Sequence, residues 1–225
     1  MKHTSILLCL LVTTSFAQDA SVKPGINDKF LDPKLKVGEW TQKFETESRE
    51  IFTQRDAIIT ACDLSPGQIV ADVGAGSGLF TFLFAKKVGP TGKVIAVDIL
   101  PEFLGEIKTI AQKNGLSNVE TLVCTEDTVP LPEASVDVVF ICDTYHHFEY
   151  PKTELASIHR ALRKDGMLIV IDFIRIPGVS RPWILDHVRA GQEIVETEIA
   201  AAGFTKIDEK KGILAENWFS RFRKN

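Results

Sequence analysis

The sequence predicts an α/β domain built on a doubly wound, mostly parallel β-sheet with helices on both faces. Strand-like apolar segments alternate with helix-like segments from residue 68 onward, a pattern that gives parallel strands joined by right-handed crossovers. A glycine-rich turn stands between the first such strand and the first such helix. The length of 225 residues, with 44% hydrophobic side chains, suits one domain with a sizeable core.

The N-terminus has the pattern of an export signal. A lysine and a histidine follow Met1, and the apolar run of residues 6–12 comes next, too short to span a bilayer. Ser15 and Ala17 occupy the two small positions that precede a cleavage site. We expect residues 1–17 to be a signal peptide and the mature protein, beginning at Gln18, to be periplasmic or secreted. The alternatives are an uncleaved anchor or a misassigned start, and a cytoplasmic protein if the signal does not function.

Residues 18–38 carry prolines, a glycine and scattered charges without a sustained period, which predicts a linker or an N-terminal arm. We expect the domain to occupy residues 39–225. Its first part, residues 39–62, has apolar side chains at helical spacing and ends in a Ser-Pro-Gly turn.

The alternation that follows defines the remaining elements. We expect strands at Gln68–Val73, Lys93–Val97, Val119–Cys124, Val136–Cys142 and Met167–Phe173, and helices at Leu79–Val88, Glu102–Asn114, Lys152–Arg163 and Val188–Ala202. The apolar character of the fifth strand is nearly continuous, which indicates burial on both faces. Two closing strands are expected at 204–207 and 217–223.

Composition excludes some partners. The formal net charge of -4 leaves no basic surplus for a polyanionic backbone, so nucleic acid is an unfavoured partner and a small molecule is preferred. Outside the signal, Cys62, Cys124 and Cys142 show no metal-type spacing and read as small buried hydrophobes. The oligomeric state is left open.

The turn after the first strand predicts a ligand site. Gly74, Gly76 and Gly78 stand at alternate positions between strand and helix. Glycine lets the backbone turn tightly and approach a ligand, and the N-terminus of the helix offers unpaired N–H donors. We therefore expect a nucleotide-like ligand at the carboxyl end of this strand.

The spacing of this turn discriminates among nucleotide cofactors. Leu79 stands where a dinucleotide fingerprint requires glycine, and no phosphate-binding loop is present. Asp72, just before the turn, is badly placed for a pyrophosphate and well placed for a cationic amino group. S-adenosylmethionine has that group and no phosphate. Asp98 ends the second strand, where a carboxylate accepts hydrogen bonds from both ribose hydroxyls.

Four segments together resemble class I S-adenosylmethionine-dependent methyltransferases, in particular the group that includes the ubiquinone/menaquinone-biosynthesis and arsenite methyltransferases. The segments are VADVGAGSG, VIAVDI, LPEASVDVVFICDTYHHF and LRKDGMLIVIDF, and the resemblance covers about residues 51–224. It implies a Rossmann-like fold whose seven-stranded sheet has an antiparallel C-terminal strand, with S-adenosylmethionine as cofactor. The candidate cofactor-binding residues are Asp72, Gly74, Gly76, Gly78, Asp98, Ile99, Glu126 and Asp143.

The sequence departs from the family pattern in two places. The family commonly has an acid after the third strand, but Thr125 stands there, which leaves the neighbouring Glu126 as a candidate. Lys164, Asp165 and Gly166 replace a Pro-Gly-Gly turn, and aspartate tolerates the positive φ that such a turn needs.

The acceptor side is less specific. Methyl transfer from a sulfonium needs mainly alignment, with a base only where the nucleophile carries a proton. His146 and His147 follow the fourth strand and are the candidate catalytic residues, with local packing as the alternative. Neighbouring side chains after a strand usually diverge, so we expect only one of them to face the pocket. Other polar and aromatic side chains follow the fifth strand and are expected to border the acceptor: Asp172, Arg175, Arg181, Trp183, Asp186, His187 and Arg189.

The resemblance thus implies methyl transfer from S-adenosylmethionine to an unidentified, small-molecule acceptor. The alternative is a non-catalytic module that binds S-adenosylmethionine or S-adenosylhomocysteine in the export compartment. An NAD-dependent oxidoreductase is disfavoured by Leu79.

The export pattern leads to a first prediction. The protein isolated from its native host should begin at Gln18, because the residues before it satisfy the cleavage-site pattern. Intact-mass spectrometry of the native protein measures this directly. Retention of Met1 on most molecules would show that the signal is not processed.

Overall fold

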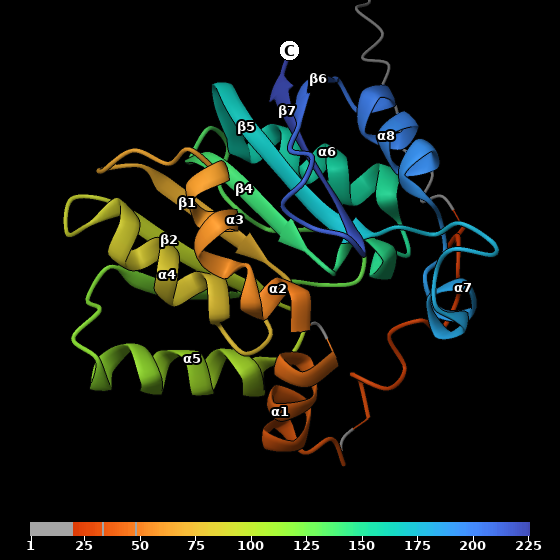
Figure 1. Cartoon of the computed structure of the whole chain (residues 1–225). Helices are drawn as coiled ribbons and strands as arrows, with labels where there is room; N and C mark the ends of the chain where they lie inside the picture. Colours follow the sequence, from red (N-terminus) through yellow and green to blue (C-terminus); the bar gives the residue numbers. More distant parts are fainter. Residues whose placement is uncertain (1–19, 33, 48) are drawn as a thin grey trace, which may run out of the picture.

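Seven strands form one mixed sheet at the centre of the molecule (Figure 1). The structure is a computed structural model that describes residues 20–32, 34–47 and 49–225. Their order is β3-β2-β1-β4-β5-β7-β6. The strands are β1 Ile69–Val73, β2 Lys93–Asp98, β3 Val119–Val123, β4 Val136–Cys142, β5 Leu162–Phe173, β6 Phe204–Glu209 and β7 Asn217–Lys224. Strands β1 to β5 pair in parallel, and β7 is antiparallel to both of its neighbours. The predicted fold class is confirmed.

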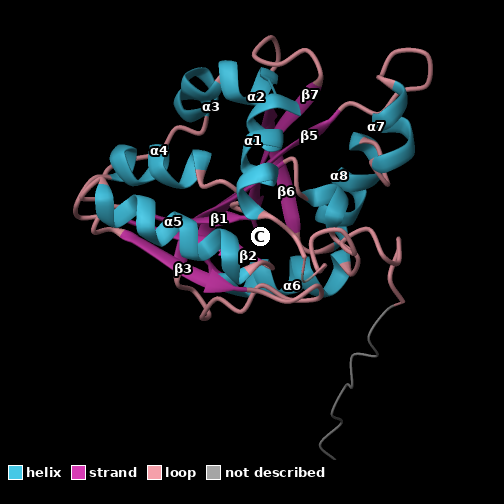
Figure 2. Cartoon of the chain, turned by 90° about the horizontal axis from the view of Figure 1, so that it is seen from below, coloured by secondary structure: helices cyan, strands magenta, loops and turns pink. Residues whose placement is uncertain are grey.

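Helices cover both faces of this sheet (Figure 2). They are α1 Val37–Glu47, α2 Arg49–Thr53, α3 Arg55–Ala61, α4 Leu79–Val88, α5 Pro101–Lys113, α6 Pro151–Ala161, α7 Pro182–His187 and α8 Gln192–Ala201, with the short 3-10 helix η1 at Tyr145–His147. Helices α3 and α4 lie on one side of the sheet, and α6 and α8 lie on the other.

Alternation along the central strands divides the core into two clusters. Val138 and Phe140 of β4 point to the side of α3 and α4, whereas Val139 and Ile141 point to the side of α6 and α8. The ring of Phe140, fully buried, lies 4.8 Å from each of the rings of two phenylalanines on α4. Because both faces are covered, the central strands read as continuous apolar runs.

Strand β5 begins earlier than the sequence predicts. The helix expected to reach Arg163 ends at Ala161, because Leu162 already pairs with Val136 of β4. The ladder then shifts register before Val138, and Asp165 within the shifted segment has φ +62°. The tolerance of aspartate for positive φ, expected from the sequence, is confirmed.

Two other helical predictions differ from the structure. The helical spacing of residues 39–62 corresponds to three short helices, α1, α2 and α3. The helix expected from Val188 begins at Gln192, and α7 precedes it. Pro182 starts α7 at a position where its missing N–H costs nothing. The carbonyl of Val188 leaves the helical pattern and accepts a hydrogen bond from Arg175 Nε at 2.8 Å.

Residues 20–32 form an N-terminal arm that packs beside α7 and the carboxyl ends of the strands (Figure 1). The backbone N–H of Val22 donates to the carbonyl of Glu149 at 2.9 Å, and Asn27 Nδ2 donates to the carbonyl of His147 at 3.1 Å. Ile26 and Asn27 are buried. The arm is therefore a packed part of the domain.

The predicted signal peptide, residues 1–17, lies outside the described residues. Within the described part of the chain, no helix has both the length and the apolar character that a membrane crossing requires.

Candidate functional site

A cleft of about 710 Å³ opens at the carboxyl ends of β1, β2 and β4. Strand order reverses between β1 and β4, and open α/β sheets bind their ligands at such a switch point. The glycine turn and Asp98 border one part of the cleft, and the histidines after β4 border another. The arm and α1 supply aromatic side chains to its outer wall: Phe30, Trp40 and Phe44.

The glycine turn adopts backbone conformations that other residues rarely take. Gly74, Gly76 and Gly78 have φ values of +72°, +50° and +80°. A Cβ at Gly74 would lie 2.2 Å from the side-chain methyl of Thr144, so only glycine fits there. Gly74 and Gly76 line the cleft, whereas Gly78 is the N-cap of α4, and a Cβ there would meet Ile107 and a phenylalanine ring of α4.

Asp98 is held rigidly at the end of β2. Its Oδ2 accepts the backbone N–H of Gly76 at 2.9 Å, and its Oδ1 accepts that of Leu100 at 3.0 Å. Burial raises the pKa of this carboxyl, and the N–H groups of Gly76, Leu100 and Ile99 act against that rise. Ile99 also lines the cleft, so this carboxylate and its neighbour are placed as the sequence predicts.

Asp72 is buried at the end of β1, with 3% of its surface exposed. Thr81 of α4 donates its hydroxyl to Asp72 Oδ2 at 2.6 Å. Burial raises the pKa of Asp72 to about 7, although the Thr81 hydrogen bond opposes that shift. Thr81 was not among the predicted site residues, although its position nine residues after Asp72, on the inner side of the next helix, indicates such a contact.

Glu126 and Asp143, the two remaining cofactor candidates, also line the cleft. Burial raises the pKa of Glu126, and the negative charges of Glu149 and Asp28 raise it further. Asp143 has φ +49°, and its Oδ1 accepts a hydrogen bond from Asn217 Nδ2 of β7 at 2.6 Å. The hydrogen bond between Asn217 and Asp143 thus ties the segment after β4 to the antiparallel C-terminal strand at this wall of the cleft.

His146 and His147 both line the cleft, and their ring centroids lie only 4.3 Å apart. The expectation that the two side chains diverge is wrong, because they belong to the turn η1 and not to an extended strand. His146 is 3% exposed, and its Nδ1 lies 2.8 Å from Asp172 Oδ1 of β5. Asp172 also accepts the backbone N–H of His146 at 2.9 Å, which fixes the orientation of the ring.

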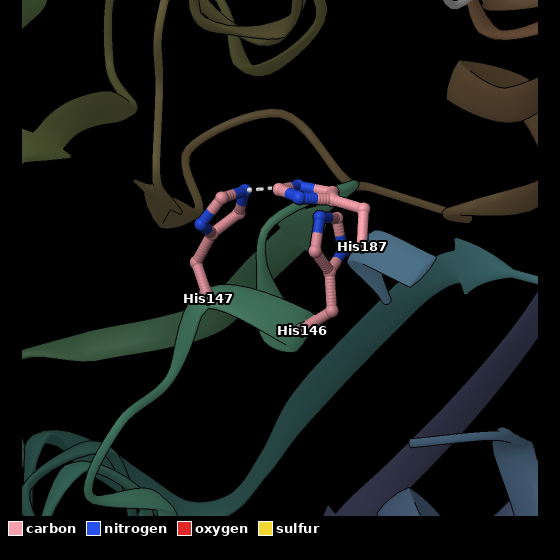
Figure 3. A group of neighbouring side chains, drawn as sticks. All are labelled: His146, His147 and His187. Carbon is pink, nitrogen blue, oxygen red and sulfur yellow. Dashed lines mark hydrogen bonds between the residues drawn. The ribbon is translucent and has the colours of Figure 1, made fainter. Parts of the chain in front are cut away.

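His187, at the end of α7, completes a cluster of three imidazoles (Figure 3). Its Nε2 lies 3.3 Å from His147 Nε2, and its ring centroid lies 5.1 Å from that of His146. Burial, followed by the charge of His146, lowers the pKa of His187 to about 4 and holds the pKa of His147 well below its usual range. These two rings are therefore neutral at neutral pH.

The other residues expected to border the acceptor divide into two groups. Trp183 and Asp186 line the cleft together with His187. The three arginines are engaged in structural contacts: Arg175 with the carbonyls of Leu185 and Val188, Arg181 with Glu216, and Arg189 with both oxygens of Glu198. Their guanidinium groups are thus not placed to bind an anionic acceptor.

The order of the seven strands, the antiparallel β7 and the glycine turn beside a strand-end carboxylate define a Rossmann-like methyltransferase fold. Comparison with known families agrees. Residues 71–170 match a family model described as a methyltransferase domain. A solved S-adenosylmethionine-dependent methyltransferase from Aquifex aeolicus superposes with a TM-score of 0.70 at 27% identity, covering 84% of this chain and 99% of that one.

Two curated relatives match over a smaller part of the chain. The chain is 29% identical over 156 residues to an arsenite methyltransferase of Halobacterium salinarum, covering 69% of this chain and 38% of that protein. It is 29% identical over 118 residues to the ubiquinone/menaquinone biosynthesis C-methyltransferase UbiE of Burkholderia multivorans, covering 52% of this chain and 48% of that protein. The chain thus spans less than half the length of these two relatives. Residues 71–170 thus form a methyltransferase domain, and the fold around them is that of the class I S-adenosylmethionine-dependent methyltransferases.

The environment of Asp72 gives a second prediction. Its pKa is raised in the folded state from 3.8 to about 7, so the stability that the protonated carboxyl contributes is complete below pH 3.8 and is lost as the pH rises through 7. The free energy of unfolding should therefore fall more steeply between about pH 5 and pH 8 in the ligand-free wild type than in Asp72→Asn. Urea unfolding at both pH values measures the difference. Parallel pH dependences in the two proteins would show that Asp72 is ionised throughout.

Proposed function

We propose that the protein transfers the methyl group of S-adenosylmethionine to a small-molecule acceptor bound in the cleft. The observation that carries this proposal is that one cavity joins the glycine turn and Asp98 to a cluster of imidazoles. A methyl donor bound beside the glycine turn and Asp98 would present its sulfonium methyl toward the imidazoles. One relative is named for arsenite and the other for ubiquinone/menaquinone biosynthesis, so the similarity to these proteins leaves the acceptor open.

We assign the cofactor contacts by chemistry. The Asp98 carboxylate has lone pairs left after its two backbone hydrogen bonds, and these would accept the ribose hydroxyls. Asp72 would meet the amino group of the methionine part. Glu126 and Ile99 would border the adenine, with Gly74 and Gly76 giving the backbone close access to the cofactor. Gly78 would contribute as the N-cap of α4. Asp143 would border the cofactor from the wall where Asn217 of β7 donates a hydrogen bond to it.

The acceptor would approach from the side of the histidines. Its nucleophilic atom forms a bond to the methyl carbon while the carbon–sulfur bond breaks, leaving S-adenosylhomocysteine. If the nucleophile is a hydroxyl or a thiol, its proton must leave. His146 is suited to accept it, because Asp172 holds Nδ1 and leaves Nε2 as the basic nitrogen.

Two further features complete the proposal. Nucleic acid stays unfavoured as an acceptor because the chain has a formal net charge of -4. We also propose, from the N-terminal pattern, that the protein is exported, which would require a supply of S-adenosylmethionine outside the cytoplasm.

The third prediction tests the cofactor site. Asp98→Ala should bind S-adenosylmethionine about tenfold more weakly or worse, because hydrogen bonds to a carboxylate contribute roughly 1.5 to 3 kcal/mol. Calorimetry measures the affinity, and NAD should not bind to either protein.

Methyl-labelled cofactor, incubated with the wild type and small molecules from the native host, should transfer its label to those small molecules. Equal affinity in both proteins would remove Asp98 from the site, and binding without transfer to any acceptor would favour the non-catalytic module.

The fourth prediction concerns the proton acceptor. With a hydroxyl or thiol acceptor, His146→Gln should slow methyl transfer by about 10²-fold and leave cofactor affinity unchanged, because a general base acts only in the transfer step. Single-turnover kinetics measure the rate. His159→Gln on α6, outside the cleft, is the matched control and should react as the wild type does. Wild-type rates in both His146→Gln and His147→Gln would show that catalysis rests on alignment alone.

A further inference from the structure

We propose that His146, His147 and His187 form a binding site for a divalent transition-metal cation of the zinc type (Figure 3). The site lies in the wall of the same cleft that would hold the methyl donor and the acceptor. The proposal that a cation binds is independent of the proposed function. The chemical role of the cation rests on that function.

The three rings are close enough to share one ion. One nitrogen from each ring can be chosen so that all three atoms lie within 4.8 Å of one another. His147 Nε2 and His187 Nε2 are 3.3 Å apart. A tetrahedral zinc ion with bonds of about 2.0–2.1 Å to nitrogen places two ligand atoms about 3.3 Å apart, so this pair already has the required spacing. The His146 nitrogen lies within 4.8 Å of the other two, so it must move toward them to reach the same spacing.

Asp172 gives the cluster an outer partner of the kind that metal sites use. Its Oδ1 binds His146 Nδ1 at 2.8 Å, and the pair is buried, with both side chains 3% exposed. Nδ1 is thereby occupied, and Nε2 is left to face a ligand. A carboxylate behind a metal-bound imidazole fixes the ring's orientation and raises its basicity. The backbone N–H of Phe173 holds the same oxygen of Asp172 at 2.7 Å.

Hydrogen bonding within the cluster does not account for its geometry. His147 Nε2 meets only another imidazole nitrogen, and one proton at most can lie between the two atoms. His147 Nδ1 is buried with no hydrogen-bond partner among the described residues. A cation bound between the two rings would take the lone pairs of His147 Nε2 and His187 Nε2, which otherwise face each other with at most one proton between them. Nδ1 would then carry the proton of the His147 ring.

The surroundings contain charge of both signs. Lys23 of the arm donates its ammonium to the carbonyl of His187 at 2.6 Å and opposes a second cation nearby. The carboxylate of Asp172, in direct contact with His146, acts in the opposite direction. Zinc, copper and nickel bind imidazole strongly, whereas magnesium and calcium prefer oxygen ligands. A cluster of three imidazoles therefore favours the first group.

Three protein ligands leave the fourth tetrahedral position open, as in catalytic rather than structural zinc sites. Under the proposed function, the hydroxyl or thiol of the acceptor would take this position and lose its proton to solvent more readily. The resulting oxygen or sulfur anion would attack the sulfonium methyl, and S-adenosylhomocysteine would leave. His146 would then be a ligand in place of the proton acceptor.

The fifth prediction is a metal titration of the full chain without an affinity tag, after treatment with a chelator. Calorimetry with Zn²⁺ and the visible absorption of Co²⁺ should show one equivalent bound at nitrogen ligands. His187→Gln should weaken binding by about 100-fold, and Asp172→Asn by about 10- to 100-fold. His159→Gln, which removes a histidine of α6 outside the cluster, should bind as the wild type does. Zn²⁺ should raise the melting temperature of the wild type and of His159→Gln only.

Two results would overturn the site: a wild type that takes up no equivalent of Zn²⁺ or Co²⁺, or one whose affinity is unchanged in His187→Gln. Circular dichroism and S-adenosylmethionine affinity check that His187→Gln is folded, and His147→Gln replaces it if it is not. Metal bound without methyl transfer to any acceptor would leave the site standing and remove the proposed function. Methyl transfer by a wild type that takes up no Zn²⁺ or Co²⁺ would remove the site and leave the proposed function standing.

Discussion

The close contact between the ends of β1 and β4 is the constraint on which the cleft depends. The chain leaves β4 so near to Gly74 that a Cβ at this position would lie 2.2 Å from Thr144. Thr144 is fixed in turn, because its hydroxyl donates to the carbonyl of Cys142 at 2.9 Å. The glycine turn and the histidine turn η1, which starts one residue later, are thus held by one contact. A side chain at position 74 would push the two walls of the cleft apart.

Much of this arrangement could be predicted from the sequence because it is encoded locally. The central strands are covered on both faces, so each appears as a continuous apolar run, and glycine spacing places the turn between β1 and α4. Asp98 follows from its position at the end of such a run. The end of α6 was predicted two residues late because Leu162 is apolar in either element; its pairing with Val136 is a tertiary contact that the sequence does not show.

The parts that were missed depend on contacts between distant segments. His187 lies 40 residues beyond His147, and nothing in the spacing of the two indicates that their imidazoles meet. The arm has no periodicity, yet Phe30 packs edge-on against the His147 ring at 5.3 Å. Arg189 was expected to border the acceptor, but it forms a bidentate ion pair with Glu198, nine residues further along the chain. Periodicity carries no information on such pairs.

Three acidic residues border the donor part of the cleft, and under the proposed reaction they affect the release of the product. Burial raises the pKa of Asp72, Asp98 and Glu126 at the donor part, so each of these carboxyls would be stabilised as an anion by a cation beside it. S-adenosylmethionine brings the sulfonium charge as well as its amino group. Methyl transfer removes the sulfonium charge, so the same carboxylates attract S-adenosylhomocysteine less strongly than the donor. These three acids therefore favour binding of the donor over retention of the product.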